Sequence, residues 1–166
     1  MKTGRPTAWN PFSSFSSTAW TEVVQLASKE RLSVPISIRR IVPWVDRIQP
    51  SGGMLAIMEL NGVAELMPWT PHGESAVSSV KAAAARAEPA AIGNLILAAM
   101  DRYVRLTLDT DGRTVLPFNL LAHVDPSNTS RVRVLAEGGR LWLWSERQWE
   151  ETRPDRLAYL KAATGL

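Results

Sequence analysis

The chain has 166 residues, a net charge of +3 and no cysteine, with 45% hydrophobic and 21% charged residues. This composition excludes a wholly disordered chain, and the lack of cysteine excludes a disulfide framework and a thiolate metal site. No apolar run approaches the roughly 20 residues that span a bilayer, and the first residues lack the basic and apolar regions of a signal peptide. We therefore expect a cytoplasmic protein without membrane contact, built around one core or two small cores that share an interface.

The positive charge is concentrated in the first third of the chain. Residues 1–49 contain seven Lys and Arg and three acidic residues, whereas the remainder contains twelve and thirteen. A face that binds a polyanion and an ordinary solvated surface both agree with this asymmetry. Charge alone leaves both interpretations open.

The first half begins with a tail and continues as a β-rich unit. Residues 1–19 combine Ser, Thr, Pro and Gly with isolated aromatic residues, which predicts a flexible arm. Strands are predicted at 23–27 and 32–34, on either side of a polar turn. A short helix that Pro43 stops or bends follows, and Asn61-Gly62 between two apolar runs predicts a β-hairpin.

The second half repeats this plan after an Ala-rich segment. Residues 75–101 predict two helices, or one kinked helix, because Pro89 interrupts them. A strand, a polar turn, a strand and a short helix follow, and then a hairpin that turns at 137–139. Ser145 with Gln148 fits a capping box, and Pro154 can open a last helix that ends near Thr164.

The two halves also align residue by residue. Residues 23–35 (VVQLASKERLSVP) match residues 105–117 (RLTLDTDGRTVLP) without a gap, at an offset of 82 residues that places Arg31 on Arg113. The hairpin of the first half aligns with RVRVLAEGGRLWLW once about five residues are allowed for the longer loop at 49–53. Two matched blocks in the same order indicate an internal repeat.

The repeated unit resembles the SpoVT-AbrB swapped-hairpin family. The segment Asp109–Pro117 carries the resemblance, with a strand, an acidic turn with Gly-Arg, a second strand and a closing proline. Two such units in one chain, the second ending in LWLWSERQWEE, resemble the MraZ-like members of that family. The resemblance implies an α+β, β-rich fold in which two tandem AbrB-like swapped-hairpin units form a small β-barrel, with a helical connector and a C-terminal helix.

These expectations divide the chain into five parts. They are a flexible arm (1–19), the first AbrB-like unit (20–69), a helical connector (70–101), the second AbrB-like unit (102–152) and a C-terminal helix (153–166).

The resemblance also puts forward DNA-binding residues, since basic side chains on one face of the fold contact DNA in that family. The candidates are Lys29, Arg31, Arg39, Arg40 and Arg113. Guanidinium groups bind phosphate bidentately and can read guanine. The alternative is that the turn arginines pair with neighbouring carboxylates, such as Glu30 or Asp109, and that Arg39 and Arg40 lie on a solvated helix face.

Two departures from the family pattern favour the first unit as the DNA-facing one. The acidic residue of the Asp-x-x-x-Arg pattern at Asp109 is replaced by Ala27 in the first unit. The VPISIRR segment, similar to IPxxLRR of AbrB, has no basic counterpart at 120–122. Trp142 and Trp144 lie on one strand face, so with Trp149 they predict a shared core or interface rather than a base-stacking platform.

An enzyme is not expected. The two histidines, His72 and His123, are not part of a catalytic motif, and no phosphate-binding glycine loop or serine elbow occurs. We expect no cofactor and no metal. The predicted function is a sequence-preferring, DNA-binding transcriptional regulator, cytoplasmic and nucleoid-associated, that binds double-stranded DNA as a homo-oligomer, a dimer or higher. The alternative is a protein-binding module, such as an AbrB-like antitoxin or anti-activator, whose aromatic tail and Trp-rich end contact a protein partner.

Overall fold

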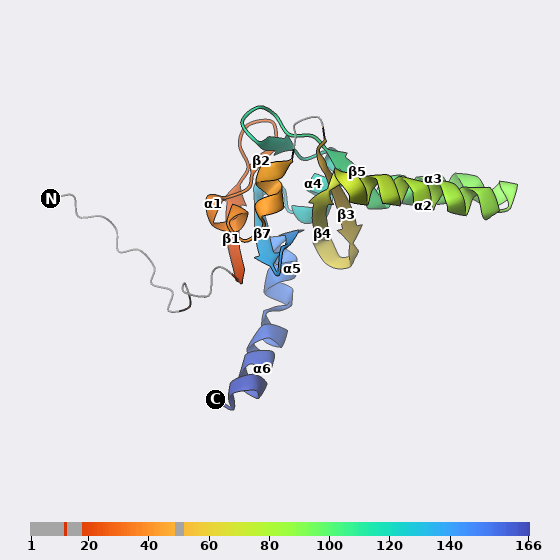
Figure 1. Cartoon of the computed structure of the whole chain (residues 1–166). Helices are drawn as coiled ribbons and strands as arrows, with labels where there is room; N and C mark the ends of the chain where they lie inside the picture. The colour runs from red at the N-terminus through yellow and green to blue at the C-terminus, as the bar shows by residue number, and fades with distance from the viewer. Residues whose placement is uncertain (1–11, 13–17, 49–51) are drawn as a thin grey trace.

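Two longer helices divide the chain into halves, and each half has the same order of elements: two strands, a short helix and two further strands (Figure 1). The structure is a computed structural model and describes residues 12, 18–48 and 52–166. The elements of the first half are β1 (Ala19–Gln25), β2 (Arg31–Ser33), α1 (Ile36–Arg39), the 3-10 helix η2 (Pro43–Arg47), β3 (Met54–Glu59), the turn η3 (Leu60–Gly62) and β4 (Val63–Pro68). The segment between the halves contains the wide turn η4 (Trp69–Gly73), α2 (Glu74–Arg86) and α3 (Pro89–Arg102). The second half contains β5 (Tyr103–Leu106), β6 (Arg113–Val115), α4 (Phe118–Val124), β7 (Arg131–Glu137), β8 (Arg140–Trp144), α5 (Glu146–Glu151) and α6 (Arg153–Thr164).

Six strands form one antiparallel sheet in the order β1-β7-β8-β4-β3-β5, and β2 and β6 form a separate antiparallel ribbon. Each half contributes a hairpin, β3–β4 or β7–β8, and the two hairpins meet where β4 pairs with β8. The first strand of each half pairs with the hairpin of the other half, because β1 lies beside β7 and β5 lies beside β3. The fold is therefore α+β, as predicted, with backbone hydrogen bonds that join the halves.

The strand register relates the halves by an approximate two-fold axis. Thr21 lies opposite Leu135, and Tyr103, which follows Thr21 by 82 residues, lies opposite Ile57 in the same way. At the centre of the ribbon, Leu32 pairs with Thr114, again 82 residues further on. The offset of 82 residues that aligns the two halves of the sequence thus also relates the residues that pair in the ribbon.

The core lies between the inner face of the sheet, the ribbon and the two short helices. Equivalent positions are buried in both halves, since Ile38 of α1 and Leu120 of α4 are fully buried, as are Val42 and Val124. A helix as short as α1 does not persist in water by itself. Burial of such side chains, worth about 1.5–3 kcal/mol each, holds both helices on the sheet.

Both predicted hairpins are confirmed. The first turns at Asn61 and Gly62, whose φ angles of 64° and 76° lie in the left-handed region that these two residue types tolerate. The second turns at the Gly138-Gly139 pair, also with positive φ. The side chain of Ser145 accepts a hydrogen bond from the backbone N–H of Gln148 and caps α5, as the sequence predicts.

Two expectations differ from the structure. The first strand runs over Ala19–Gln25 rather than 23–27, because β7 offers backbone partners as far as Glu137, opposite Ala19. The sheet is not closed into the predicted barrel: β1 and β5 are its two edges, and no pairing between them occurs in the described residues. The ribbon and the helices α1 and α4 cover the inner face instead.

Two helical segments project from this body (Figure 1). The helices α2 and α3 form an antiparallel pair in which no residue is buried, with Pro89 in the first turn of α3. The helix α6 extends from α5 and likewise contains no buried residue. No helix in the described part of the chain is both long and apolar enough to cross a membrane. Of the predicted N-terminal arm, only Phe12, Thr18 and Ala19 belong to the described residues.

Candidate nucleic-acid interface

The ribbon of β2 and β6 brings the two predicted turn arginines onto one surface. In its register Arg31 lies opposite Val115, and Ser33 lies opposite Arg113. Leu32 and Thr114, between them, point inward and are buried. Arg31 and Arg113 therefore share the outward face as diagonal neighbours, about 7–8 Å apart at this position of an antiparallel pair.

The cations in the turn of the first half lie apart from the carboxylates of the described residues. Backbone hydrogen bonds in both directions between Ala27 and Arg31 close it, and Lys29 and Glu30 adopt positive φ angles of 63° and 54°. Lys29 is exposed and Arg31 is half-buried. Neither forms an ion pair with any described residue.

The turn of the second half neutralises its arginine. The Arg113 Nε donates to Asp109 Oδ2 at 3.1 Å, and Nη2 donates to Asp111 Oδ2 at 3.2 Å. The backbone N–H of Arg113 donates to Asp109 and holds the pKa of that carboxyl below its ordinary value, and the N–H of Asp111 and the guanidinium act in the same direction. Arg113 thus pairs with the carboxylates of its own turn. This is the alternative to DNA contact that the sequence offers for the turn arginines.

The two arginines of α1 differ in their surroundings. Arg39 points toward the second turn, where its Nη2 would lie 3.7 Å from a Cβ on Gly112, and it faces Asp46 at 3.8 Å. Its Nε is buried and has no hydrogen-bond partner among the described residues. Arg40 is exposed and forms no ion pair within the described ranges. Arg40 is therefore the more available of the two for a ligand.

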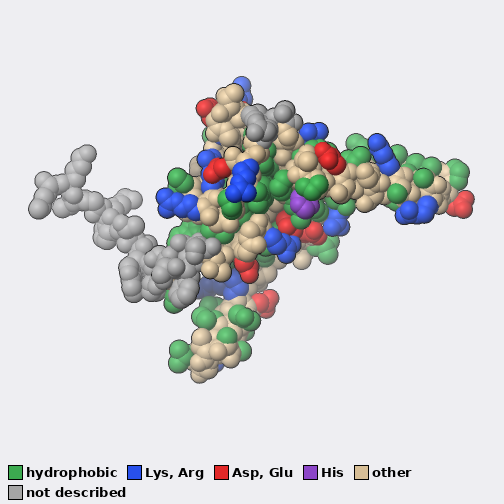
Figure 2. All heavy atoms as spheres, in the orientation of Figure 1, with side chains coloured by type: hydrophobic (Ala, Val, Ile, Leu, Met, Phe, Trp, Pro, Cys, Tyr) green, Lys and Arg blue, Asp and Glu red, His purple; other side chains and the backbone are tan. Residues whose placement is uncertain are grey.

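The two halves differ in the charge of equivalent surface residues, although equivalent core positions are buried in both. At the offset of 82 residues, Lys29 corresponds to Asp111, Ala27 to Asp109 and Arg40 to Ala122. Lys29 and Arg40, which form no ion pair with a described residue, thus stand where the second half has Asp111 and Ala122, and Ala27 lacks the carboxylate that Asp109 supplies. Figure 2 shows Lys and Arg side chains scattered among acidic and apolar ones on the face it displays, so no broad basic surface marks that face.

The tryptophans of the second half lie on the sheet face away from the core. Trp144 and Trp149 meet edge to face, with ring centroids 5.7 Å apart. Trp149 is also flanked by the guanidinium groups of Arg133 and Arg156, which lie 4.6 and 3.5 Å from its ring centroid. Trp149 thus packs against Trp144 and two arginines outside the core, so the predicted core shared by Trp142, Trp144 and Trp149 is wrong, and an interface formed by them stays a prediction. The arginines that stack on it were not foreseen, because no sequence spacing links strand β7 to α6.

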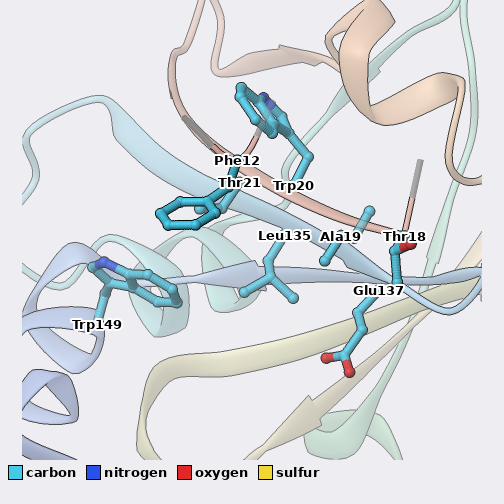
Figure 3. A pocket seen from close by; sticks show the side chains of 9 residues that line it. Phe12, Thr18, Ala19, Trp20, Thr21, Leu135, Glu137 and Trp149 are labelled. Atoms are coloured by element: carbon cyan, nitrogen blue, oxygen red, sulfur yellow. The ribbon is translucent and has the colours of Figure 1, made fainter. Parts of the chain in front are cut away.

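A hollow of about 480 Å³ lies at the β1 edge of the same face. Figure 3 shows the ring of Phe12 above β1 and β7, with Trp20, Leu135 and Trp149 around it. Phe12 of the predicted arm therefore lines this hollow, although its side chain stays 66% exposed.

The two histidines lie in different surroundings. The Nε2 of His123 lies 2.9 Å from the carbonyl oxygen of Val63 and can donate a hydrogen bond to it. His72 lies exposed in the turn before α2. No group of three or more potential metal-ligating side chains is found among residues 18–48 and 52–166.

Comparison with known proteins adds no family assignment. No family model matches the chain, and no curated protein is significantly similar to it.

Proposed function

We propose that the chain is a sequence-preferring DNA-binding transcriptional regulator that uses two tandem swapped-hairpin units. The exchange of first strands between the halves supports this proposal, because β1 and β5 each complete the hairpin of the other half. The two hairpins themselves lie side by side, with β4 next to β8. The resemblance to the SpoVT-AbrB family implies interleaved hairpins, and the exchange of first strands is the part of that arrangement that supports the proposal.

The observation that carries the proposal is the set of unneutralised cations on the first half. Lys29, Arg31 and Arg40 form no ion pair within the described residues, whereas Arg113, at the equivalent position to Arg31, is bound by two carboxylates. Exposed cations without internal partners are available to phosphate oxygens. We expect Lys29 and Arg31 to make the main contacts, Arg40 to add to them, and Arg39 and Arg113 to contribute less.

The two-stranded ribbon that carries Arg31 has a shape that fits the major groove of duplex DNA. Two-stranded β-ribbons enter the major groove of B-DNA, and the outward face of β2–β6 carries Arg31 with no carboxylate bound to it. Phosphate contacts supply most of the affinity and make it fall with salt. A homo-oligomer would add further contacts and raise the affinity by multivalency. Such a regulator would act in the cytoplasm, on the nucleoid.

The test compares two triple variants that remove the same charge. The first is Lys29→Ala/Arg31→Ala/Arg40→Ala, and the control is Arg147→Ala/Arg153→Ala/Lys161→Ala on α5 and α6, whose three cations are all exposed. Fluorescence anisotropy measures binding to the DNA upstream of the protein's own coding sequence, and to a scrambled duplex, across a salt series.

We expect the wild type and the control to prefer the upstream DNA, with affinity that falls as salt rises. The interface variant should bind weakly, and the slope of log K against log salt should become shallower by about 0.9 for each phosphate that the variant no longer binds. Equal weakening in both variants would assign the effect to total charge and contradict the interface. No binding by the wild type at low salt would contradict DNA binding as such.

A protein-binding module remains the second candidate, and α6 favours it. Leu157, Tyr159 and Leu160 are exposed by 53%, 77% and 58% on this projecting helix. Exposed apolar side chains on one element often mark an interaction site. A salt-insensitive complex with a co-encoded protein, abolished in Leu157→Ala/Leu160→Ala and kept in the Lys29→Ala/Arg31→Ala/Arg40→Ala variant, would favour this candidate.

A further inference from the structure

An aromatic side chain stands out from the surface beside the unpaired cations. Phe118, the first residue of α4, is 86% exposed, and Val115 at the end of β6 is 52% exposed. A phenylalanine so exposed gains nothing from the hydrophobic core. Its position is therefore open to an intermolecular role.

The chain fixes the direction in which Phe118 points. Pro117, with φ of −63° and ψ of 158°, precedes it and sets the entry to α4. Leu116 and Leu120, on either side of this pair, are 3% and 0% exposed and anchor the segment in the core. The phenyl ring thus stands on a rigid base, with little backbone freedom to lose on binding.

Backbone contacts place Phe118 next to the cationic turn. The N–H of Leu116 donates to the carbonyl oxygen of Glu30 at 3.0 Å, and Val115 lies opposite Arg31. Phe118 and Glu30 line the same hollow of about 540 Å³. The lining of this hollow contains Glu30 and Asp125 and no Lys or Arg of the described residues. Arg31 lies on the same side of the ribbon through its register opposite Val115, three residues before Phe118, and Lys29 precedes Arg31 in the same turn.

The other half provides a matched position with the opposite charge. Ile36 corresponds to Phe118 at the offset of 82 residues, begins α1 after Pro35 and is 68% exposed. It follows the ribbon at the end nearer the second turn, where carboxylates neutralise Arg113. An apolar side chain at this site is therefore tolerated by the fold on both halves, but Phe118 follows the ribbon at the end nearer the first turn, where Lys29 and Arg31 form no ion pair with a described residue.

We propose that Phe118 reads thymine by contact with its C5-methyl group in the major groove, while Lys29 and Arg31 hold the adjacent phosphates. This inference rests on the proposed DNA-binding function. Thymine is the only base of DNA that presents a methyl group in that groove, and apolar side chains including Phe recognise it. The surface thus joins a sequence-independent element, the cations, to an apolar element that distinguishes thymine from the other bases.

The test combines a protein variant with a chemical change in the DNA. The upstream duplex is made in two forms, one with thymine and one with deoxyuridine throughout, which differ only in the C5-methyl groups. Binding of both duplexes is measured by anisotropy at one salt concentration for the wild type, Phe118→Ala and the control Ile36→Ala. Circular dichroism and urea unfolding check that each variant keeps the fold.

We expect the wild type and Ile36→Ala to bind the uracil duplex at least about fourfold more weakly, the factor expected for the loss of one buried methyl group. Phe118→Ala should bind the thymine duplex more weakly than the wild type and should lose this discrimination. The inference is overturned, with DNA binding intact, if Phe118→Ala keeps the full preference for thymine or if the wild type has none. Absence of DNA binding by the wild type would overturn the proposed function together with the inference.

Discussion

A buried hydroxyl at the centre of the ribbon offers a test of how the fold is held together. Thr114 of β6 is 2% exposed, and its Oγ1 is buried without a hydrogen-bond partner among the described residues. Its equivalent in the first half is Leu32, which is 1% exposed and fully apolar. The equivalent position thus holds an apolar side chain, and we expect the hydroxyl of Thr114 to lower stability.

The change Thr114→Val replaces that hydroxyl by a methyl group of similar size. A buried polar group without a partner costs about 1–3 kcal/mol, so the variant should raise the free energy of unfolding by roughly that amount. The melting temperature of a chain of this length should then rise by about 2–4 °C for each kcal/mol gained. Urea unfolding followed by tryptophan fluorescence and by circular dichroism measures the difference.

Thr21→Val is the matched control, since Thr21 also lies in a strand. Its Oγ1 donates to the carbonyl oxygen of Val134 at 3.0 Å and accepts from Arg133 at 3.2 Å. Loss of a satisfied hydroxyl should destabilise the fold by about 0.5–1.5 kcal/mol. A destabilised Thr114→Val variant would refute the reasoning. Equal stabilisation by both changes would refute it as well, because the strand propensity of valine rather than the missing hydrogen bond would then explain the result.

Three further predictions concern the second turn and a close backbone contact. Asp109→Asn should lower stability at neutral pH, and its difference from the wild type should vanish in acid. The pKa of Asp109 is lowered in the folded state, so its contribution is complete above the ordinary value of about 3.9 and is lost as pH falls through the lowered value. Asp111→Asn should strengthen DNA binding at low salt, because it removes a carboxylate from Arg113. Gly53→Ala should destabilise the fold by more than the roughly 1–2 kcal/mol cost of left-handed backbone, since the new Cβ would lie 2.2 Å from the carbonyl oxygen of Leu106.

Each of these has a distinct contrary result. A stability difference for Asp109→Asn that persists below the folded-state pKa would mean that shape rather than charge is responsible. Unchanged DNA affinity in Asp111→Asn would place Arg113 away from the nucleic acid. A normal melting temperature for Gly53→Ala would mean that β5 shifts easily from its position beside Gly53. Thermal unfolding measures the first and third, and anisotropy measures the second.

Several features of the fold follow from local sequence. The Asn61-Gly62 pair sets a hairpin because few other residues adopt two successive left-handed conformations. Pro89 separates α2 from α3 because it lacks an N–H donor and is tolerated only in a first turn. Ser145 begins α5 because its hydroxyl accepts a backbone N–H. These interactions involve residues close in sequence, so a local pattern is sufficient to predict them.

The candidate interface was only partly predictable for the same reason. The resemblance of the sequence put forward Lys29, Arg31, Arg39, Arg40 and Arg113 as candidates, and the residues offered both DNA contact and carboxylate pairing for the turn arginines. Which cations are neutralised depends on side-chain geometry, as in the hydrogen bonds of Arg113 to Asp109 and Asp111. The exposure of Phe118 was not predicted, because an apolar residue at the start of a short helix carries no signal that it is exposed.

The sequence by itself determined the repeated order of elements, the turns, the helix boundaries set by Pro and Ser, and the excess of positive charge in the first third. Tertiary structure alone decided that β1 and β5 are exchanged between the halves, that the sheet stays open, and that α2 and α3 project from the body. The physical reason is range. Turn and cap preferences are energies of a few adjacent residues, whereas strand exchange and charge pairing depend on groups that are brought together only when the core of both halves forms.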